Sequence, residues 1–375
     1  MRVYATKTRV LGYLLFAVGL LPFYLLPVWA GVLYEFYAFE PWQVGMLLAA
    51  DTGGGTIASL AARFWITRAN WRRAVLSSLS CAVLVNSLSI FSDSFTALFL
   101  LRILAGIAAG CFMAVVYAMF SSCENPDREF SIALALQVLL GAAAIYSVPI
   151  FLKHFGPGSL FAVVAMVTMA PMLVAANCPP GGDSDTEKSP SLRNISRYVW
   201  AGLAAIAFVF LSLSCIWIAM ERLGSAAGFD GSVVTTVLAA SMLFSFLGAA
   251  APAMTTNLTA RKVQMSVSYV SLALAIFTVG NNSTVLLFAF GLCLYNFFYS
   301  FIIPFQTAWL AQSDLSGATA VLVPVAQGLG VTVGPIVGGY LLGDGKFAGI
   351  IVASSAFLAL SYICAKCAGD PIRSV

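Results

Sequence analysis

The chain has 375 residues, of which 61% are hydrophobic and 9% are charged, whereas about 25% of the residues in an average soluble domain are charged. A soluble protein of this composition would expose too much apolar surface, so we expect an all-α, multi-pass membrane protein with the lipid bilayer as its partner. The net charge of +4 is spread over short loops. It therefore does not indicate a nucleic-acid partner.

Apolar runs bounded by polar residues, Gly or Pro predict twelve membrane-spanning helices. The longest hydrophilic interval, 179–197, has the composition of a flexible linker. We therefore expect an N-terminal six-helix bundle over 1–178 and a C-terminal six-helix bundle over 198–375, joined by a cytoplasmic linker over 179–197. In chain order the predicted spans cover 11–35, 42–66, 73–92, 95–121, 130–152, 159–177, 198–222, 232–254, 263–280, 284–311, 318–342 and 347–367.

Basic residues are distributed unevenly between alternate connections. With the amino terminus inside, fifteen of the nineteen Lys and Arg residues fall on the cytoplasmic side. The opposite side holds Lys153, Arg222 and Lys346, and Arg102 lies within the fourth predicted span. Because short cytoplasmic loops carry the excess of basic residues, we expect both termini to be cytoplasmic and the protein to lie in the inner (cytoplasmic) membrane.

The two predicted bundles share a weak internal repeat. The basic pair Arg72-Arg73 has a counterpart 189 residues later in Arg261-Lys262, and Gln137 has a counterpart 190 residues later in Gln327. Repeated halves are typical of secondary transporters, whose substrate site lies at the interface between the repeats.

Three local patterns resemble one known family. Arg102 is followed by a spaced Gly/Ala stripe that ends at Gly110, residues 330–339 form a glycine-proline pattern in span eleven, and residues 61–73 occupy a basic loop between spans two and three. Over essentially its whole length the chain resembles the major facilitator superfamily of transporters. The resemblance implies two six-helix bundles related by pseudo-two-fold symmetry, alternating access, and a central cavity lined by spans one, seven and ten.

The resemblance is incomplete at two places. The loop between spans two and three has Ala62 where the family has an acidic residue, and it has no glycine before Arg72. Span five lacks the family's glycine-proline antiporter motif, which disfavours drug export by proton exchange. The strings that begin at Glu221 and Asp314 resemble those of bacterial members.

Asp51 lies about 13 Å deep in the second predicted span, close to the bilayer midplane. An acid at that depth costs about 2.5–3.5 kcal/mol on insertion scales, so it marks a transport pathway or a proton relay. Its alternative role is a structural acid bonded to a neighbouring helix. The run Gly53-Gly54-Gly55 favours close approach of another helix beside it.

Arg102 lies roughly 10 Å below the outer surface in span four, at a depth similar to that of Asp51. The two residues are candidates for proton coupling and also for an ion pair. If they pair, Arg102 holds Asp51 ionised and the proton-carrier hypothesis weakens, which leaves an uncoupled facilitator as the alternative. Arg102 is alternatively a contact for an anionic substrate.

Other polar residues are candidates for binding or gating. The amides of Gln137, Asn296 and Gln327 suit a polar substrate group, although helix–helix hydrogen bonding explains them equally well. Glu221 and Arg222, at an outer helix end, and Asp314, after span ten, are candidate gate residues. For the first two the alternative is an interfacial charge pair. The resemblance places aromatic side chains of spans one, seven and ten in the cavity wall: Tyr24, Trp29, Trp217, Tyr295 and Tyr299.

These features predict a monomeric secondary active transporter that is driven by protons. Its solute is expected to be a small organic molecule with apolar or aromatic character, and an organic acid if Arg102 is free. A transporter-like sensor or assembly protein is the alternative from another class. An enzyme is disfavoured because the sequence contains no HExxH or GxSxG motif and a single histidine, His154. No cofactor and no metal are predicted.

Overall fold

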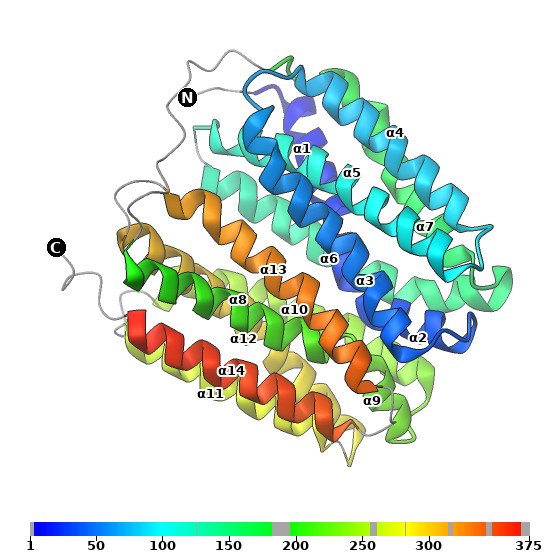
Figure 1. Cartoon of the computed structure of the whole chain (residues 1–375), viewed down its shortest axis with the longest axis vertical. Helices are drawn as coiled ribbons and strands as arrows, with labels where there is room; N and C mark the ends of the chain where they lie inside the picture. The colour runs from blue at the N-terminus through cyan, green and yellow to red at the C-terminus, as the bar shows by residue number, and fades with distance from the viewer. Residues whose placement is uncertain are drawn as a thin grey trace. The chain divides into compact units, whose positions relative to one another are not determined.

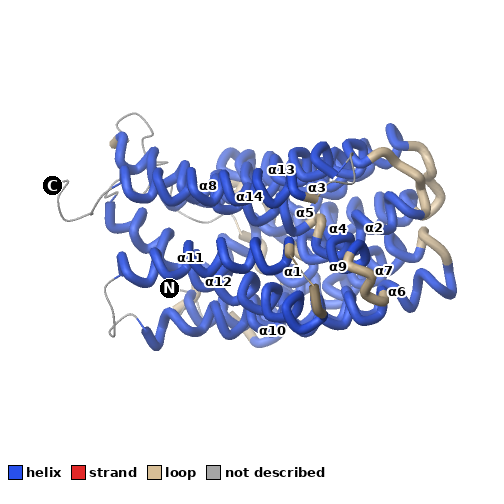
Figure 2. The backbone as a smooth tube through the Cα atoms, turned by 90° about the horizontal axis from the view of Figure 1, so that it is seen from below, coloured by secondary structure: helices blue, strands red, loops and turns tan. Residues whose placement is uncertain are grey.

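The computed structural model describes residues 4–124, 126–181, 196–255, 261–281, 283–313, 318–342 and 347–368. Helices make up almost all of these residues, and the described part of the chain contains no β-strand (Figure 2). The predicted all-α fold class is therefore confirmed.

In the described part of the chain, the first six predicted spans correspond to seven α-helices and two short 3-10 helices. Span one is divided at Leu20, because Pro22 at the start of the second helix has no backbone N–H to continue the hydrogen bonds of the first. The helices are α1 (Thr6–Gly19), α2 (Leu21–Glu35), α3 (Pro41–Ala61), η1 (Ala62–Phe64), α4 (Trp71–Ser89), α5 (Phe95–Ser121), α6 (Pro126–Phe155), α7 (Ser159–Met169) and η2 (Ala170–Asn177).

Among the described residues, the second six predicted spans correspond to seven further helices (Figure 1). Span seven is divided into a long helix and a short one, and the other five are continuous. They are α8 (Arg197–Trp217), α9 (Met220–Ala226), α10 (Gly231–Thr255), α11 (Arg261–Gly280), α12 (Val285–Ser313), α13 (Ala318–Leu341) and α14 (Ala348–Ala368).

The internal contacts divide the chain into two units. Unit 1 comprises Met1–Phe39 and Met46–Lys188, and unit 2 comprises Glu40–Gly45 and Ser189–Val375. In unit 1, α4 packs against α5 and α7, and α1 packs against α6. In unit 2, α8 packs against α13 and α14, and α10 packs against α12. The exact bounds of the two bundles and the linker stay a prediction.

Eleven helical segments among the described residues are long and apolar enough to cross a membrane, which identifies a multi-pass membrane protein. The third predicted span, which corresponds to α4, is not among these segments: it is 19 residues long but less apolar, because it is rich in serine. Ser78 and Ser89 donate their hydroxyl protons to backbone carbonyls four residues earlier, at 2.7 and 2.8 Å. These hydroxyls are therefore satisfied within the helix itself.

Glycines bring α3 and α5 into backbone contact within unit 1. A Cβ atom at Gly54 would lie 2.4 Å from the carbonyl oxygen of Ile103, and one at Gly106 would lie 1.9 Å from that of Asp51. No larger residue fits at either position without a shift of the backbone. The close helix approach predicted from the glycine run is confirmed, and it holds Asp51 against α5.

Candidate functional site

Arg102 is held by two neutral acceptors on α4. Its Nη1 donates to Oδ1 of Asn86 at 3.0 Å, and its Nη2 donates to Oγ of Ser89 at 2.8 Å. Asn86 and Ser89 are three residues apart and so lie on one face of the helix. Each also donates to a carbonyl of its own helix, Asn86 to Ala82 and Ser89 to Val85. These bonds turn the acceptor oxygens toward the guanidinium group.

Asp51 makes the longest of the polar contacts to Arg102. Its Oδ2 lies 3.4 Å from Nη1, the same nitrogen that donates to Asn86 at 3.0 Å. Both side chains are buried, with 3% of Arg102 and 7% of Asp51 exposed. The arginine is thus fixed mainly by uncharged groups of α4, while Asp51 supplies the balancing charge from α3.

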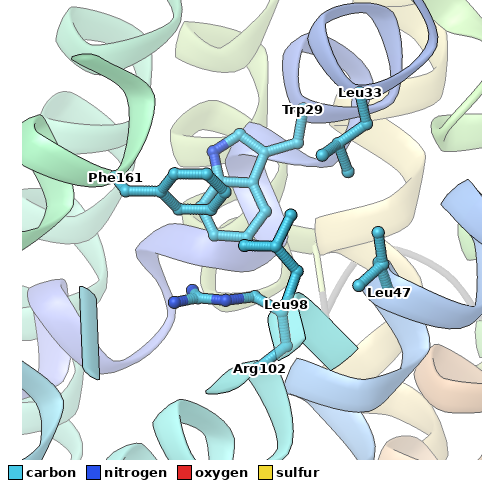
Figure 3. Close-up of a pocket in the computed structure, with 6 residues that line it drawn as sticks. All are labelled: Trp29, Leu33, Leu47, Leu98, Arg102 and Phe161. Atoms are coloured by element: carbon cyan, nitrogen blue, oxygen red, sulfur yellow. The ribbon is translucent and has the colours of Figure 1, made fainter. Parts of the chain in front are cut away.

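Two aromatic rings lie beside the guanidinium group. Its central carbon is 5.5 Å from the ring centre of Trp29 on α2 and 5.0 Å from that of Phe161 on α7. These rings and three leucines line a narrow pocket that has no room for a water molecule (Figure 3). The pocket residues are Trp29, Leu33, Leu47, Leu98, Arg102 and Phe161.

Two hydrogen-bond donors at this pocket have no acceptor among the described residues: Nε of Arg102 and Nε1 of Trp29. Both residues are almost completely buried, with 2% and 1% of their surfaces exposed. A buried donor without an acceptor is costly. The two groups can bind an oxygen atom of a ligand only in a conformation in which this pocket is wider than it is here.

The remaining candidates in unit 1, Tyr24 and Gln137, take no part in the described hydrogen bonds around Arg102. Tyr24 is buried on α2, where its ring contacts that of Phe23 edge to face. Gln137 is buried on α6, and its Oε1 has no donor among the described residues. Neither residue shares a described hydrogen bond with Arg102 or Asp51.

The aromatic candidates of unit 2 form a ladder of parallel rings. The rings of Trp217 and Tyr295 have centres 5.7 Å apart and are inclined by 3°, and those of Tyr295 and Tyr299 are 6.3 Å apart and inclined by 9°. The hydroxyl of Tyr295 donates to the carbonyl of Leu213 at 2.8 Å, which fixes the middle ring. Tyr299 is half-buried at the end of the ladder.

The polar candidates of unit 2 have different surroundings. Asn296 uses its amide to join two helices, because its Nδ2 donates to Oγ of Ser241 at 3.0 Å and its Oδ1 accepts from Ser245 at 3.1 Å. Gln327 is half-buried on α13, and Glu221 and Arg222 are half-buried in the first turn of α9. Asp314 lies outside the described residues.

The sequence interpretation missed the residues that fix the site. Asn86, Ser89 and Phe161 were not candidates, although the spacing of Asn86 and Ser89 in an apolar span was a usable signal. Glu129, which follows a basic residue at the start of α6, is a second buried acid with 3% of its surface exposed. It accepts from the Tyr13 hydroxyl at 2.5 Å and lies 3.7 Å from Arg9.

Comparison with known proteins gives matches only among solved structures. No protein-family model and no curated protein matches the chain. A crystal structure of a mutant of the nucleoside transporter NupG matches with a TM-score of 0.74 and 13% identity, over 96% of this chain and 97% of the other. A bacterial homologue of the human lysosomal transporter Spinster, in an inward-facing and unoccupied conformation, matches with a TM-score of 0.67 and 14% identity, over 98% and 97%. The chain therefore has the fold of the major facilitator superfamily transporters.

Proposed function

We propose that the protein is a proton-coupled secondary active transporter that moves a small organic solute across the inner membrane by alternating access, with both termini in the cytoplasm. The membrane-spanning helices and the fold that the chain shares with solved transporters support transport. The buried polar cluster around Arg102 supports the coupling to protons.

The observation that carries the proposal is that Arg102 is held by uncharged residues, while its only charged partner among the described residues is bound more loosely. Asn86 and Ser89 hold the guanidinium group at 3.0 and 2.8 Å, whereas Asp51 makes a single contact at 3.4 Å. Protonation of Asp51 therefore removes the balancing charge without releasing Arg102 from α4. Asp51 is the partner that can be replaced.

Charge balance then links a proton to the solute. A buried charge without a partner is strongly unfavourable, so Arg102 requires one negative charge beside it in every state. When a proton neutralises Asp51, an anionic group of the solute supplies that charge. The donors Nε of Arg102 and Nε1 of Trp29, which lack acceptors among the described residues, are suited to hold its oxygen atoms.

The rings of Trp29 and Phe161, which lie beside the guanidinium group of Arg102 in unit 1, favour a solute with an aromatic body. Aromatic rings pair with a further planar group in offset-stacked or edge-to-face arrangements. One of the solved proteins with this fold is a nucleoside transporter, and a nucleoside also contains a planar ring. We therefore place a planar ring together with an acidic group in the preferred solute.

The second candidate function is a facilitator without ion coupling. The buried pair of Asp51 and Arg102 favours it, because a permanently closed ion pair takes up no proton. The two functions differ in one measurable property, which is whether a pH gradient drives accumulation of the solute above its external concentration.

The test is uptake into proteoliposomes with an imposed pH gradient, comparing the wild type with Asp51→Asn. Benzoate serves as the planar acid and uridine as an uncharged planar solute, after a thermal-shift screen of both. We expect the wild type to accumulate the acid above the level in protein-free liposomes and the variant to stay at that level, while exchange at equal pH continues in both. Equal accumulation by the variant would remove Asp51 from the coupling step, and no accumulation by either protein would favour the facilitator.

A further inference from the structure

The two units contain the same helix contact at a fixed distance along the chain. In unit 1, a Cβ atom at Gly54 on α3 would lie 2.4 Å from the carbonyl oxygen of Ile103 on α5. In unit 2, a Cβ atom at Gly248 on α10 would lie 2.0 Å from the carbonyl oxygen of Phe297 on α12. Both members of the second pair follow those of the first by 194 residues. The contact of α10 with α12 is thus the counterpart of the contact of α3 with α5.

The same shift of 194 residues relates the polar pairs beside these glycines. The counterpart of Asp51 is Ser245, and the counterpart of Arg102 is Asn296. Ser245 donates to Oδ1 of Asn296 at 3.1 Å, as Arg102 donates to Asp51 at 3.4 Å, and 51 residues separate the members of each pair. One unit therefore has a charged bond and the other an uncharged bond at the same place.

The surroundings of the two pairs also correspond. Nδ2 of Asn296 donates to the hydroxyl of Ser241 and to the carbonyl of Leu292, both at 3.0 Å. Their counterparts 194 residues earlier are Leu47 and Leu98, which line the pocket around Arg102. An asparagine amide at position 102 could thus donate to the carbonyl of Leu98, as Asn296 does to that of Leu292. A serine at position 47 would supply the second acceptor, the counterpart of Ser241.

We propose that Ser245 and Asn296 are positioning residues that form an uncharged helix clasp, and that Asp51 and Arg102 are its charged form. The clasp in unit 2 joins two helices through the same backbone contact without any charge. The charges in unit 1 are therefore dispensable for packing α3 on α5 and serve proton coupling. This last step rests on the transport function proposed above.

The test transfers the uncharged clasp into unit 1. The variant D51S/R102N carries the counterparts of both charged residues, and L47S/D51S/R102N also carries the counterpart of Ser241. D51A/R102N is the matched control, because it leaves the same cavity but has no hydroxyl at position 51. S245A removes the natural bond in unit 2. Each protein is purified in detergent and its melting temperature is measured.

We expect D51S/R102N to fold and to melt above D51A/R102N by roughly 2 °C, the effect of about one hydrogen bond in a membrane protein of this size. S245A should melt below the wild type by a similar amount. Equal melting temperatures of D51S/R102N and D51A/R102N, or failure of D51S/R102N to fold while D51A/R102N folds, would overturn the correspondence. These comparisons do not depend on transport.

Transport by the folded L47S/D51S/R102N variant tests the assignment of the charges. We expect it not to accumulate benzoate above the level in protein-free liposomes under a pH gradient that drives further accumulation by the wild type. Accumulation by the variant would overturn the assignment of the charges to coupling. If the wild type itself accumulates nothing, the proposed function fails, whereas the melting temperatures still decide whether the clasp exists.

Discussion

Gly106→Ala is a direct perturbation of the contact that places Asp51 beside Arg102. The new Cβ atom would lie 1.9 Å from the carbonyl oxygen of Asp51, whereas ordinary contact begins at 3.4 Å. Because that oxygen belongs to the backbone, α3 and α5 must separate locally by roughly 1.5 Å. Overpacking of this kind costs about 1–3 kcal/mol, and the separation also lengthens the contact between Asp51 and Arg102.

Gly55→Ala is the matched control, because its Cβ atom would lie 3.4 Å from the carbonyl oxygen of Gly106 across the same interface. Both variants gain the same helix propensity of about 1 kcal/mol, so the difference between them isolates the overpacking. We expect Gly106→Ala to melt about 2–6 °C below Gly55→Ala in detergent. Equal melting temperatures would refute the backbone contact between α3 and α5, and with it the placement of the charged pair.

Three further predictions concern other residues. Arg102→Lys keeps the charge but loses the planar fork, so one ammonium group cannot reach α4 and Asp51 together; we expect a folded protein with reduced pH-driven accumulation, and wild-type accumulation would contradict this. Tyr13→Phe removes the hydrogen bond from the Tyr13 hydroxyl to the buried Glu129 on α6 and should lower the free energy of unfolding by about 1.5–3 kcal/mol. Tyr4→Phe is the control: the Tyr4 hydroxyl bonds the neutral Ser122, so the loss should be about 0.5–1.5 kcal/mol. An equal loss in the two variants would argue against a charged partner of Tyr13. Burial raises the pKa of Cys178 to about 11, so little of its thiolate is present at pH 8. A maleimide should therefore modify the exposed Cys367 before Cys178, which mass spectrometry of the peptides will check. Equal rates of modification at the two cysteines would refute the burial of Cys178.

The membrane-spanning helices could be predicted because the bilayer leaves the sequence few alternatives. A segment that crosses the hydrocarbon core must satisfy all its backbone groups internally, which requires about 20 apolar residues in a helix. The break at Leu20 was missed, although Pro22 carried the signal. The short helix α9 was likewise read as the end of span seven, since composition alone does not show where a helix changes direction.

The charged members of the site were also predictable, whereas the signal for their partners was weaker and was missed. Asp51 and Arg102 stand out because ionisable groups inside a membrane are costly. Asn86 and Ser89 are uncharged polar residues on one face of α4, and whether that face meets Arg102 depends on how α4 is rotated against α5. The neutral pair of Ser245 and Asn296 gave even less signal, because uncharged polar residues are common between membrane helices.

The polarity of α4 has a physical explanation in this arrangement. A buried arginine has five N–H groups, and each one without an acceptor is costly. If carboxylates alone satisfied them, the site would either carry excess negative charge or lose its anchor whenever a proton arrived. Asn86 and Ser89 satisfy two of the groups without charge, and the price is a helix less apolar than its neighbours. Under the proposed function, the polar residues of α4 therefore allow a single acid, Asp51, to change its protonation state while Arg102 stays in place.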